Sequence, residues 1–173
     1  MLDAIANFLT SGGIDEFVAT HDWAWPLGEI LHFFGMALLI GSVGLVDLRM
    51  LGVGKGIPIK SLEKFIWLGV IGFIINLLTG IMFVAGNPVG GPQEYLTNLA
   101  LQLKMLCVLI AGVNLLLFYA LGIAKKANAT EPYGDAPLSA KVVAVVSLLL
   151  WFGVIYFGRF IMYNDTLLYA WGL

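Results

Sequence analysis

The sequence predicts an all-α integral membrane protein, a bundle of four transmembrane helices with a short N-terminal helix at the membrane interface. Of its 173 residues, 60% are hydrophobic and only 12% are charged, whereas soluble domains carry about 25% charged residues. The hydrophobic residues fall into four blocks, and about 20 helical residues are needed to cross a bilayer. Too few residues remain between the blocks for a second core, so the whole chain is predicted to form one domain.

An amphipathic stretch precedes the first block. Ile5, Phe8 and Leu9 recur at helical spacing, and the pattern stops at Gly12 and Gly13, since glycine is the commonest residue at which a helix ends. An amphipathic segment beside a membrane span is typical of a helix lying in the plane of the interface. We therefore expect a short interfacial helix there.

The residues that flank the four blocks mark their boundaries. Trp23 and Trp25 precede the first block, as suits the aromatic belt at a membrane surface, and Pro26 is compatible with a first helical turn. Glycine- and proline-rich segments precede the later blocks, and such segments do not continue a helix. The predicted spans are residues 26–48, 65–84, 99–123 and 141–162.

Basic residues are concentrated in two loops, which four spans place on the same side of the membrane. Cytoplasmic loops carry the excess of Lys and Arg, so we expect these loops in the cytoplasm and both termini on the opposite side. No basic patch of the kind that nucleic acid requires is present, and the predicted partner is the lipid bilayer. Seven of the nine basic residues lie in these loops: Arg49, Lys55, Lys60, Lys64, Lys125, Lys126 and Lys141.

Four ionisable residues lie inside the predicted spans, where charge is costly and indicates function. Glu29 and His32 of the first span lie ~5 and ~9 Å from its non-cytoplasmic end, by the rise of a helix. By the same rise, Lys104 of the third span and Arg159 of the fourth lie ~8 and ~5 Å from that side. Three helices are thus predicted to bring these groups into one layer of the outer leaflet.

His32 has two interpretations. Gly28 and Gly35 stand four residues before it and three after it, which leaves the backbone around the imidazole bare. A flat macrocycle fits such a surface with the imidazole on its metal, which makes His32 a candidate metal ligand and the two glycines candidate cofactor contacts. Close helix packing requires the same small residues, and Ser42 extends their stripe. Glu29 shares this face because it lies three residues from His32.

The two cations inside the spans also have two interpretations. Lys104 and Arg159 lie near helix ends, so their long side chains can reach the lipid headgroups. Arg159 also shares a helix face with Tyr156 and Tyr163, and an arginine among aromatic rings binds anionic groups such as a haem propionate or a lipid phosphate.

Further polar residues are expected to meet one another. Asn76 of the second span and Asn114 of the third lie near mid-depth on faces rich in small residues, where a hydrogen bond between amides stabilises a helix pair modestly. At the inner end of the first span, Asp47 and Arg49 are expected to pair at the membrane boundary.

Three segments carry a resemblance to known families. The segments LHFFGMALLIG (residues 31–41), DLRMLG (47–52) and LKML (103–106) are similar to the first and third helices of HemJ-type protoporphyrinogen oxidases and CopD-like copper-resistance domains. Over residues 23–163 the chain most resembles an uncharacterised family of small bacterial four-helix membrane proteins, whose members have no assigned activity.

The HemJ-type resemblance implies a b-type haem bound by His32, with Lys104 at the position of the family's lysine, in a bacterial inner membrane. The other histidine, His21, would lie ~16 Å from His32 along one continuous helix, too far to bind the same iron. The second axial ligand would then be Met36, another methionine, Lys104 or water.

Three hypotheses for function follow. The first is a single b-type haem near the outer leaflet for redox chemistry or electron transfer, with Lys104 and Arg159 balancing the propionate charge. The second is a cofactor-free accessory subunit of a larger membrane complex or homo-oligomer, in which the four intramembrane ionisable side chains satisfy one another. The third, a small transporter or metal carrier, is weaker because the sequence has no interrupted span and no inverted repeat.

Overall fold

Four long helices dominate the computed structural model, which describes residues 2–88 and 90–172. They are α3 (Ala24–Met50), α5 (Ile66–Ala85), α7 (Leu99–Ala120) and α9 (Leu138–Phe160), and each is long and apolar enough to cross a membrane. All regular elements among the described residues are helical. The predicted all-α four-helix membrane bundle is therefore confirmed, with helix ends that differ from the predicted ones by three residues or fewer.

Shorter helices lie at the two ends of the bundle. The predicted N-terminal helix is present as α1 (Leu2–Thr10), and a second helix, α2 (Ile14–Thr20), follows Gly13, whose φ of 69° suits glycine. The sequence did not indicate α2, because its seven residues are too few to show a helical period. The remaining short helices are α4 (Ile59–Glu63), α6 (Gly91–Thr97), α8 (Ile123–Asn128), η1 (Ile161–Tyr163) and α10 (Asn164–Trp171).

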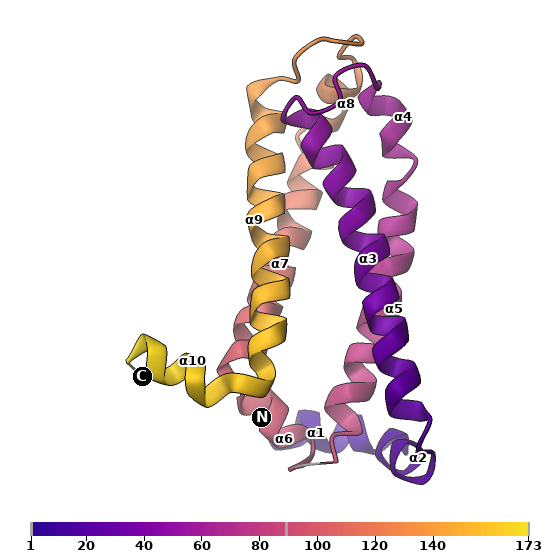
Figure 1. Ribbon diagram of the computed structural model, residues 1–173, viewed down its shortest axis with the longest axis vertical. Coiled ribbons are helices and arrows are strands. Elements are labelled where there is room, and N and C mark those ends of the chain that lie inside the picture. The colour runs from indigo at the N-terminus through magenta and orange to yellow at the C-terminus, as the bar shows by residue number, and fades with distance from the viewer. Residues whose placement is uncertain (1, 89, 173) are drawn as a thin grey trace.

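The long helices form two hairpins, α3 with α5 and α7 with α9 (Figure 1). Glycines allow the first pair to approach closely: a Cβ on Gly72 would collide with the Gly35 carbonyl oxygen, and one on Gly69 would lie 2.7 Å from Ser42 Oγ. Helices α3 and α9 join the hairpins, whereas α5 and α7 are not a packed pair within the described chain. The hairpins diverge toward the end at which both termini lie.

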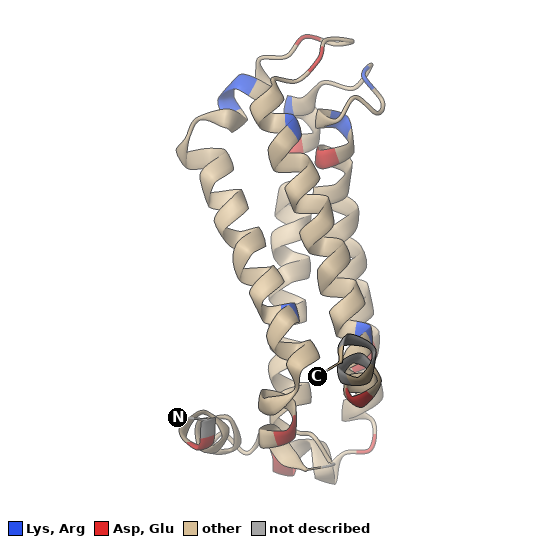
Figure 2. Cartoon of the chain, turned by 90° about the vertical axis from the view of Figure 1, so that its left-hand side faces the viewer, with Lys and Arg blue, Asp and Glu red and all other residues tan. Residues whose placement is uncertain are grey.

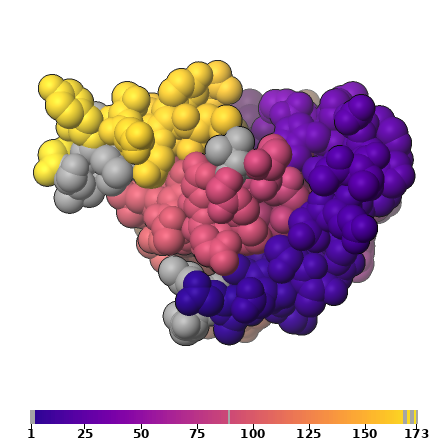
Figure 3. All heavy atoms as spheres, turned by 90° about the horizontal axis from the view of Figure 1, so that it is seen from below, coloured from indigo at the N-terminus to yellow at the C-terminus, as the bar shows by residue number. Residues whose placement is uncertain are grey.

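Charge distinguishes the two ends of the bundle. Lys and Arg gather at the end that carries the α3–α4 and α8–α9 loops, where some acidic residues also lie, whereas the outermost segments at the end near both termini carry acidic residues and no Lys or Arg (Figure 2). We call these the basic end and the terminal end. At the terminal end, α6 contacts α1, α5 and α7 and so bridges the two hairpins, and it lies between the N-terminal helices and α10 (Figure 3).

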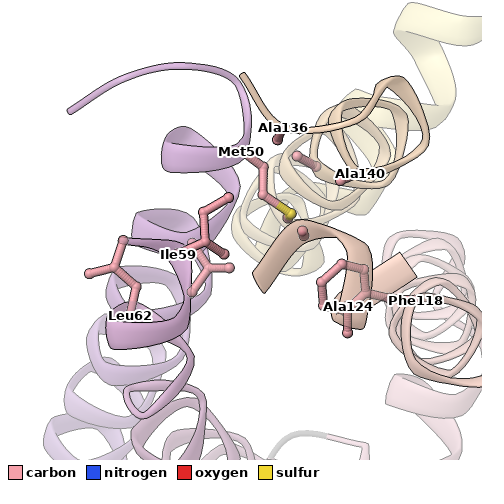
Figure 4. Close-up of a cluster of buried hydrophobic side chains, with 10 residues drawn as sticks. Met50, Ile59, Leu62, Phe118, Ala124, Ala136 and Ala140 are labelled. Atoms are coloured by element: carbon pink, nitrogen blue, oxygen red, sulfur yellow. The ribbon is translucent and has the colours of Figure 1, made fainter. Parts of the chain in front are cut away.

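The most buried cluster of apolar side chains lies at the basic end (Figure 4). Alanines at 124, 127, 136, 140 and 144 let the start of α9 approach α3, and the short helix α8 approach α4 and α9. Met50 and Ile59 are 2% and 1% exposed, and Phe118 closes the cluster from α7. The four helices are therefore held together mainly at this end.

Arg49 is fully buried beside this cluster, with 1% of its surface exposed. Its Nε donates to the Ile57 carbonyl at 2.6 Å and its Nη2 to the Lys55 carbonyl at 3.0 Å, which fixes the loop after α3. The expected pairing of Arg49 with Asp47 is wrong: residues two apart project to different sides of a helix, and no ion pair joins the two among the described residues.

Candidate functional site

His32 lies about two turns from the terminal end of α3, against α5. Its Nδ1 is 2.7 Å from the Thr79 hydroxyl, and that hydroxyl is 2.7 Å from the Ile75 carbonyl oxygen one turn earlier on α5. The threonine has one proton and gives it to the carbonyl, as threonines inside helices commonly do. Nδ1 is then the donor to Thr79, so the lone pair of His32 resides on Nε2.

The surroundings of the imidazole hold this orientation. Phe83 of α5 meets the ring edge to face, with centroids 5.5 Å apart, and Thr79 is buried. Nε2 has no hydrogen-bond partner among the described residues. A neutral imidazole whose Nδ1–H is bound and whose Nε2 is free is the form in which histidine binds a metal.

Lys104 of α7 extends along the bare backbone of α9 at Gly158. A Cβ at Gly158 would meet the Lys104 Cδ, Cε and Nζ atoms at 3.7–3.8 Å. No carboxylate lies within ion-pair distance of this ammonium in the described chain. His32 on α3 and Lys104 on α7 belong to different hairpins.

The other two ionisable residues of this layer have separate partners. Arg159 is exposed and lies over the Tyr163 ring, 5.4 Å from its centroid, and Glu29 is exposed and accepts a hydrogen bond of 3.2 Å from Trp25 Nε1. Across the described residues, no hydrogen bond or ion pair joins Glu29, His32, Lys104 or Arg159 to another of the four. The mutually satisfied polar network of the second hypothesis is therefore absent.

Gly28 and Gly35 both face α5. A Cβ at Gly28 would collide with the Met82 thioether, and one at Gly35 would lie 2.7 Å from Asn76 Nδ2. The helix-packing interpretation therefore accounts for both glycines. They also bring α5 close enough to α3 for Thr79 to reach His32.

Asn76 and Asn114 do not bond each other, contrary to expectation. Asn76 Nδ2 donates to the Gly72 carbonyl in its own helix, at 2.9 Å, and Asn114 Nδ2 donates to the Val143 carbonyl on α9, at 3.1 Å. The small-residue faces of α5 and α7 meet α3 and α9, respectively, rather than each other.

The donors near His32 suit a group that brings most of its own ligands. A bare metal ion needs several protein donors, and no group of three or more His, Cys, Asp and Glu residues is arranged for one among the described residues. Porphyrin nitrogens already surround a haem iron, which needs one or two axial ligands from the protein. A single oriented imidazole can therefore serve as an axial ligand of haem, whereas the described residues offer no cluster of three or more such side chains for a bare ion.

The fold and this layer of polar groups define a multi-pass membrane protein. Residues 18–164 match the model of a family described as "Family of unknown function (DUF6644)", and the chain belongs to that family. No curated protein and no solved structure matches the chain. The predicted membership of an uncharacterised family is confirmed, while the comparisons give no support for a likeness to HemJ-type or CopD-like proteins.

Thr79 is the residue of this site that the sequence did not reveal. It lies seven residues from Gly72 on α5, and thus on the face that packs against α3. The one signal that was present is a threonine in a mostly apolar span, three residues after Asn76. Its meaning depends on which helix it faces, which hydropathy does not specify.

Proposed function

We propose that this protein binds one b-type haem between its two hairpins, in the half toward the terminal end, and serves redox chemistry or electron transfer. The observation that carries the proposal is the chain from His32 to Thr79 to Ile75, which leaves Nε2 free to bind iron. Haem bound there would supply one-electron chemistry.

The protein's own residues would set the properties of the group. Thr79 holds the imidazole in one orientation and, by accepting a hydrogen bond from Nδ1–H, makes Nε2 a stronger ligand. Lys104 and Arg159 would balance the charge of the propionates, since neither has a carboxylate partner among the described residues. Gly28 and Gly35 would act indirectly, by bringing Thr79 against His32.

Optical spectra of two histidine variants test the proposal. The wild type and both variants are expressed with ample haem supply. The wild type should show a haem band in the reduced-minus-oxidised spectrum, and His32→Ala should lack this band while it stays helical and membrane-inserted. His21→Ala is the matched control and should keep the band, because His21 is exposed outside the spans and its Nδ1 contacts Thr20 and the Phe17 carbonyl. A band retained in His32→Ala would refute His32 as the ligand.

A wild-type protein without haem would favour the accessory-subunit hypothesis. In that case His32→Ala would lower stability or the assembly of a larger complex with no optical change. Co-purification of the wild type and of His32→Ala from mild detergent distinguishes this outcome from simple misfolding of the variant.

We also propose that the protein lies in a bacterial inner membrane with both termini in the periplasm. The basic end would face the cytoplasm, in accordance with the positive-inside rule. In a Cys107→Ala background, a membrane-impermeant thiol reagent should label Asp3→Cys from the periplasm but not Ile57→Cys. The reverse pattern would overturn the orientation.

A further inference from the structure

A second polar site lies inside the bundle, in the half toward the basic end. A partly open cavity of about 180 Å³ is lined by residues of α3, α5, α7 and α9. Its walls are mostly apolar and include the aromatic rings of Phe73, Phe118 and Trp151. This region is separate from His32, which contacts the opposite half of α5.

Asp47 supplies an unsatisfied acceptor to this cavity. The residue is only 3% exposed, and its Oδ2 has no hydrogen-bond partner among the described residues. Ser147 lines the same cavity. No ion pair joins Asp47 to Arg49 within the described chain: two guanidinium nitrogens of Arg49 donate to the loop carbonyls of Lys55 and Ile57, and its Nη1 also has no partner. A buried carboxyl oxygen without a partner is costly, so a ligand that donates to it is stabilised.

Asn114 adds a second acceptor to the cavity wall. Its amide nitrogen already donates to the Val143 carbonyl at 3.1 Å, so the amide oxygen is the atom that remains to accept a hydrogen bond. The cavity thus offers acceptors from two helices within an otherwise apolar and aromatic wall.

The cavity is accessible from the lipid rather than from water. Val70 and Phe73 on α5 and Leu115 on α7 line it and are also 37%, 36% and 42% exposed. These helices are not a packed pair within the described chain, so the opening lies between them. A ligand that enters here must be dissolved in the membrane.

We infer that this cavity binds a membrane-soluble phenol or hydroquinone, with its ring between the aromatic walls and a hydroxyl donating to Asp47. The size agrees, because an apolar protein cavity of about 150 Å³ takes up benzene. A bare cation suits the cavity less well: Ca²⁺ needs at least about six oxygens, and Asp47, Asn114 and Ser147 are its oxygen-bearing side chains.

Two probes of the same shape test the inference in the detergent-solubilised full chain. Calorimetric titration compares 4-ethylphenol with its methyl ether, 4-ethylanisole, after correction for partition into empty micelles. The phenol should bind the wild type at least about tenfold more tightly, because the ether lacks the donor that a carboxyl group recognises. Ethylhydroquinone, kept reduced, should bind more tightly than the phenol if its second hydroxyl reaches Asn114, which would indicate a hydroquinone as the natural ligand; equal affinity would indicate a monophenol.

Variants connect the preference to the cavity. Asp47→Leu should abolish the preference for the phenol over the ether, and Asp135→Asn, a change in an exposed loop, should preserve it. Gly112→Leu should weaken both probes, since a Cβ there meets open space at the cavity wall.

Three results would overturn the inference. Equal affinity of the phenol and the ether for the wild type would mean that only apolar contact matters. No binding of either probe would mean that the cavity holds water alone. A preference that survives in Asp47→Leu would place the phenol elsewhere.

Discussion

The two ends of the bundle differ in how closely their helices pack. At the basic end, small residues bring α9 against α3 and α8 against α4 and α9, and the buried guanidinium of Arg49 donates to two loop carbonyls, although Arg49 Nη1 and Asp47 Oδ2 have no partner among the described residues. At the terminal end the hairpins diverge, and Lys104 and the Nε2 of His32 have no hydrogen-bond partner or ion pair among the described residues. The basic end therefore holds the fold together, while the terminal end keeps polar groups available for a ligand.

This difference predicts that substitutions at the two ends affect different properties of the protein. Changes at the basic end should reduce stability, whereas changes around His32 should alter binding and leave the fold intact. The predictions below follow in order of expected effect.

The largest effect is expected at Arg49. Arg49→Met removes two hydrogen bonds from a charged donor and leaves the carbonyls of Lys55 and Ile57 unpaired, which should lower the free energy of unfolding by about 3 kcal/mol or more. Arg49→Lys keeps the charge but not the fork of donors and should lose less. Denaturation in mixed micelles, followed by circular dichroism, measures both. Wild-type stability in Arg49→Met would refute the structural role of the basic end.

A glycine pair on α5 gives a matched test of helix packing. Gly72→Ala places a methyl group against the Gly35 carbonyl and should destabilise the protein by about 1–3 kcal/mol, because two backbones must separate. Gly80→Ala meets nothing within 4 Å, and should be neutral or stabilising by up to about 1 kcal/mol, since alanine favours a helix. The same denaturation assay applies, and equal effects at both positions would contradict the hairpin geometry.

Thr79 is predicted to affect binding more than stability. Thr79→Val keeps the shape but removes the acceptor for His32 Nδ1, so haem affinity should fall about tenfold or more. Thr79→Ser keeps the hydroxyl and should bind like the wild type. Titration of apoprotein with haem, followed by absorbance, gives the affinities. An unchanged haem affinity in Thr79→Val would show that the hydrogen bond from His32 to Thr79 does not contribute to haem binding.

The smallest effect is expected in the loops at the basic end. Hydrogen bonds from Lys55, at 3.0 Å, and from Lys141, at 3.2 Å, lower the pKa of Asp135 below its usual value. A lowered folded-state pKa means that the stabilisation is fully present above the ordinary carboxyl pKa of about 4, and disappears as the pH falls through the lowered value.

Asp135→Asn should therefore be slightly less stable than the wild type at pH 7, and the difference should vanish in acid and shrink in high salt. Melting curves at several pH values measure this difference. A difference that grew as the pH fell would contradict the assigned direction.

Hydropathy was sufficient to predict the four spans. A run of about twenty apolar residues can cross a lipid bilayer as a helix, which satisfies its backbone hydrogen bonds internally. Hydropathy did not determine which spans pack together. All spans carry small residues, so Asn76 and Asn114 were wrongly expected to meet although they face α3 and α9, respectively. The Asp47–Arg49 pairing failed for a related reason, since the loop carbonyls that bind Arg49 are invisible in a hydropathy pattern.

The candidate site was likewise predicted only in part from the sequence. His32 and Lys104 were singled out because ionisable groups inside a span are costly, and the structure places them on different hairpins, on α3 and α7. Thr79 and the cavity beside Asp47 were missed, because both arise from the packing of helices that are distant in sequence.

The haem content of purified wild-type protein tests the central claim most directly. Protein expressed with ample haem supply should give about one haem b per chain in an alkaline pyridine haemochrome assay, and His32→Ala prepared in parallel should give none. Wild-type protein that is folded and membrane-inserted but contains no haem would contradict the account, and the two ends of the bundle would then differ in packing alone.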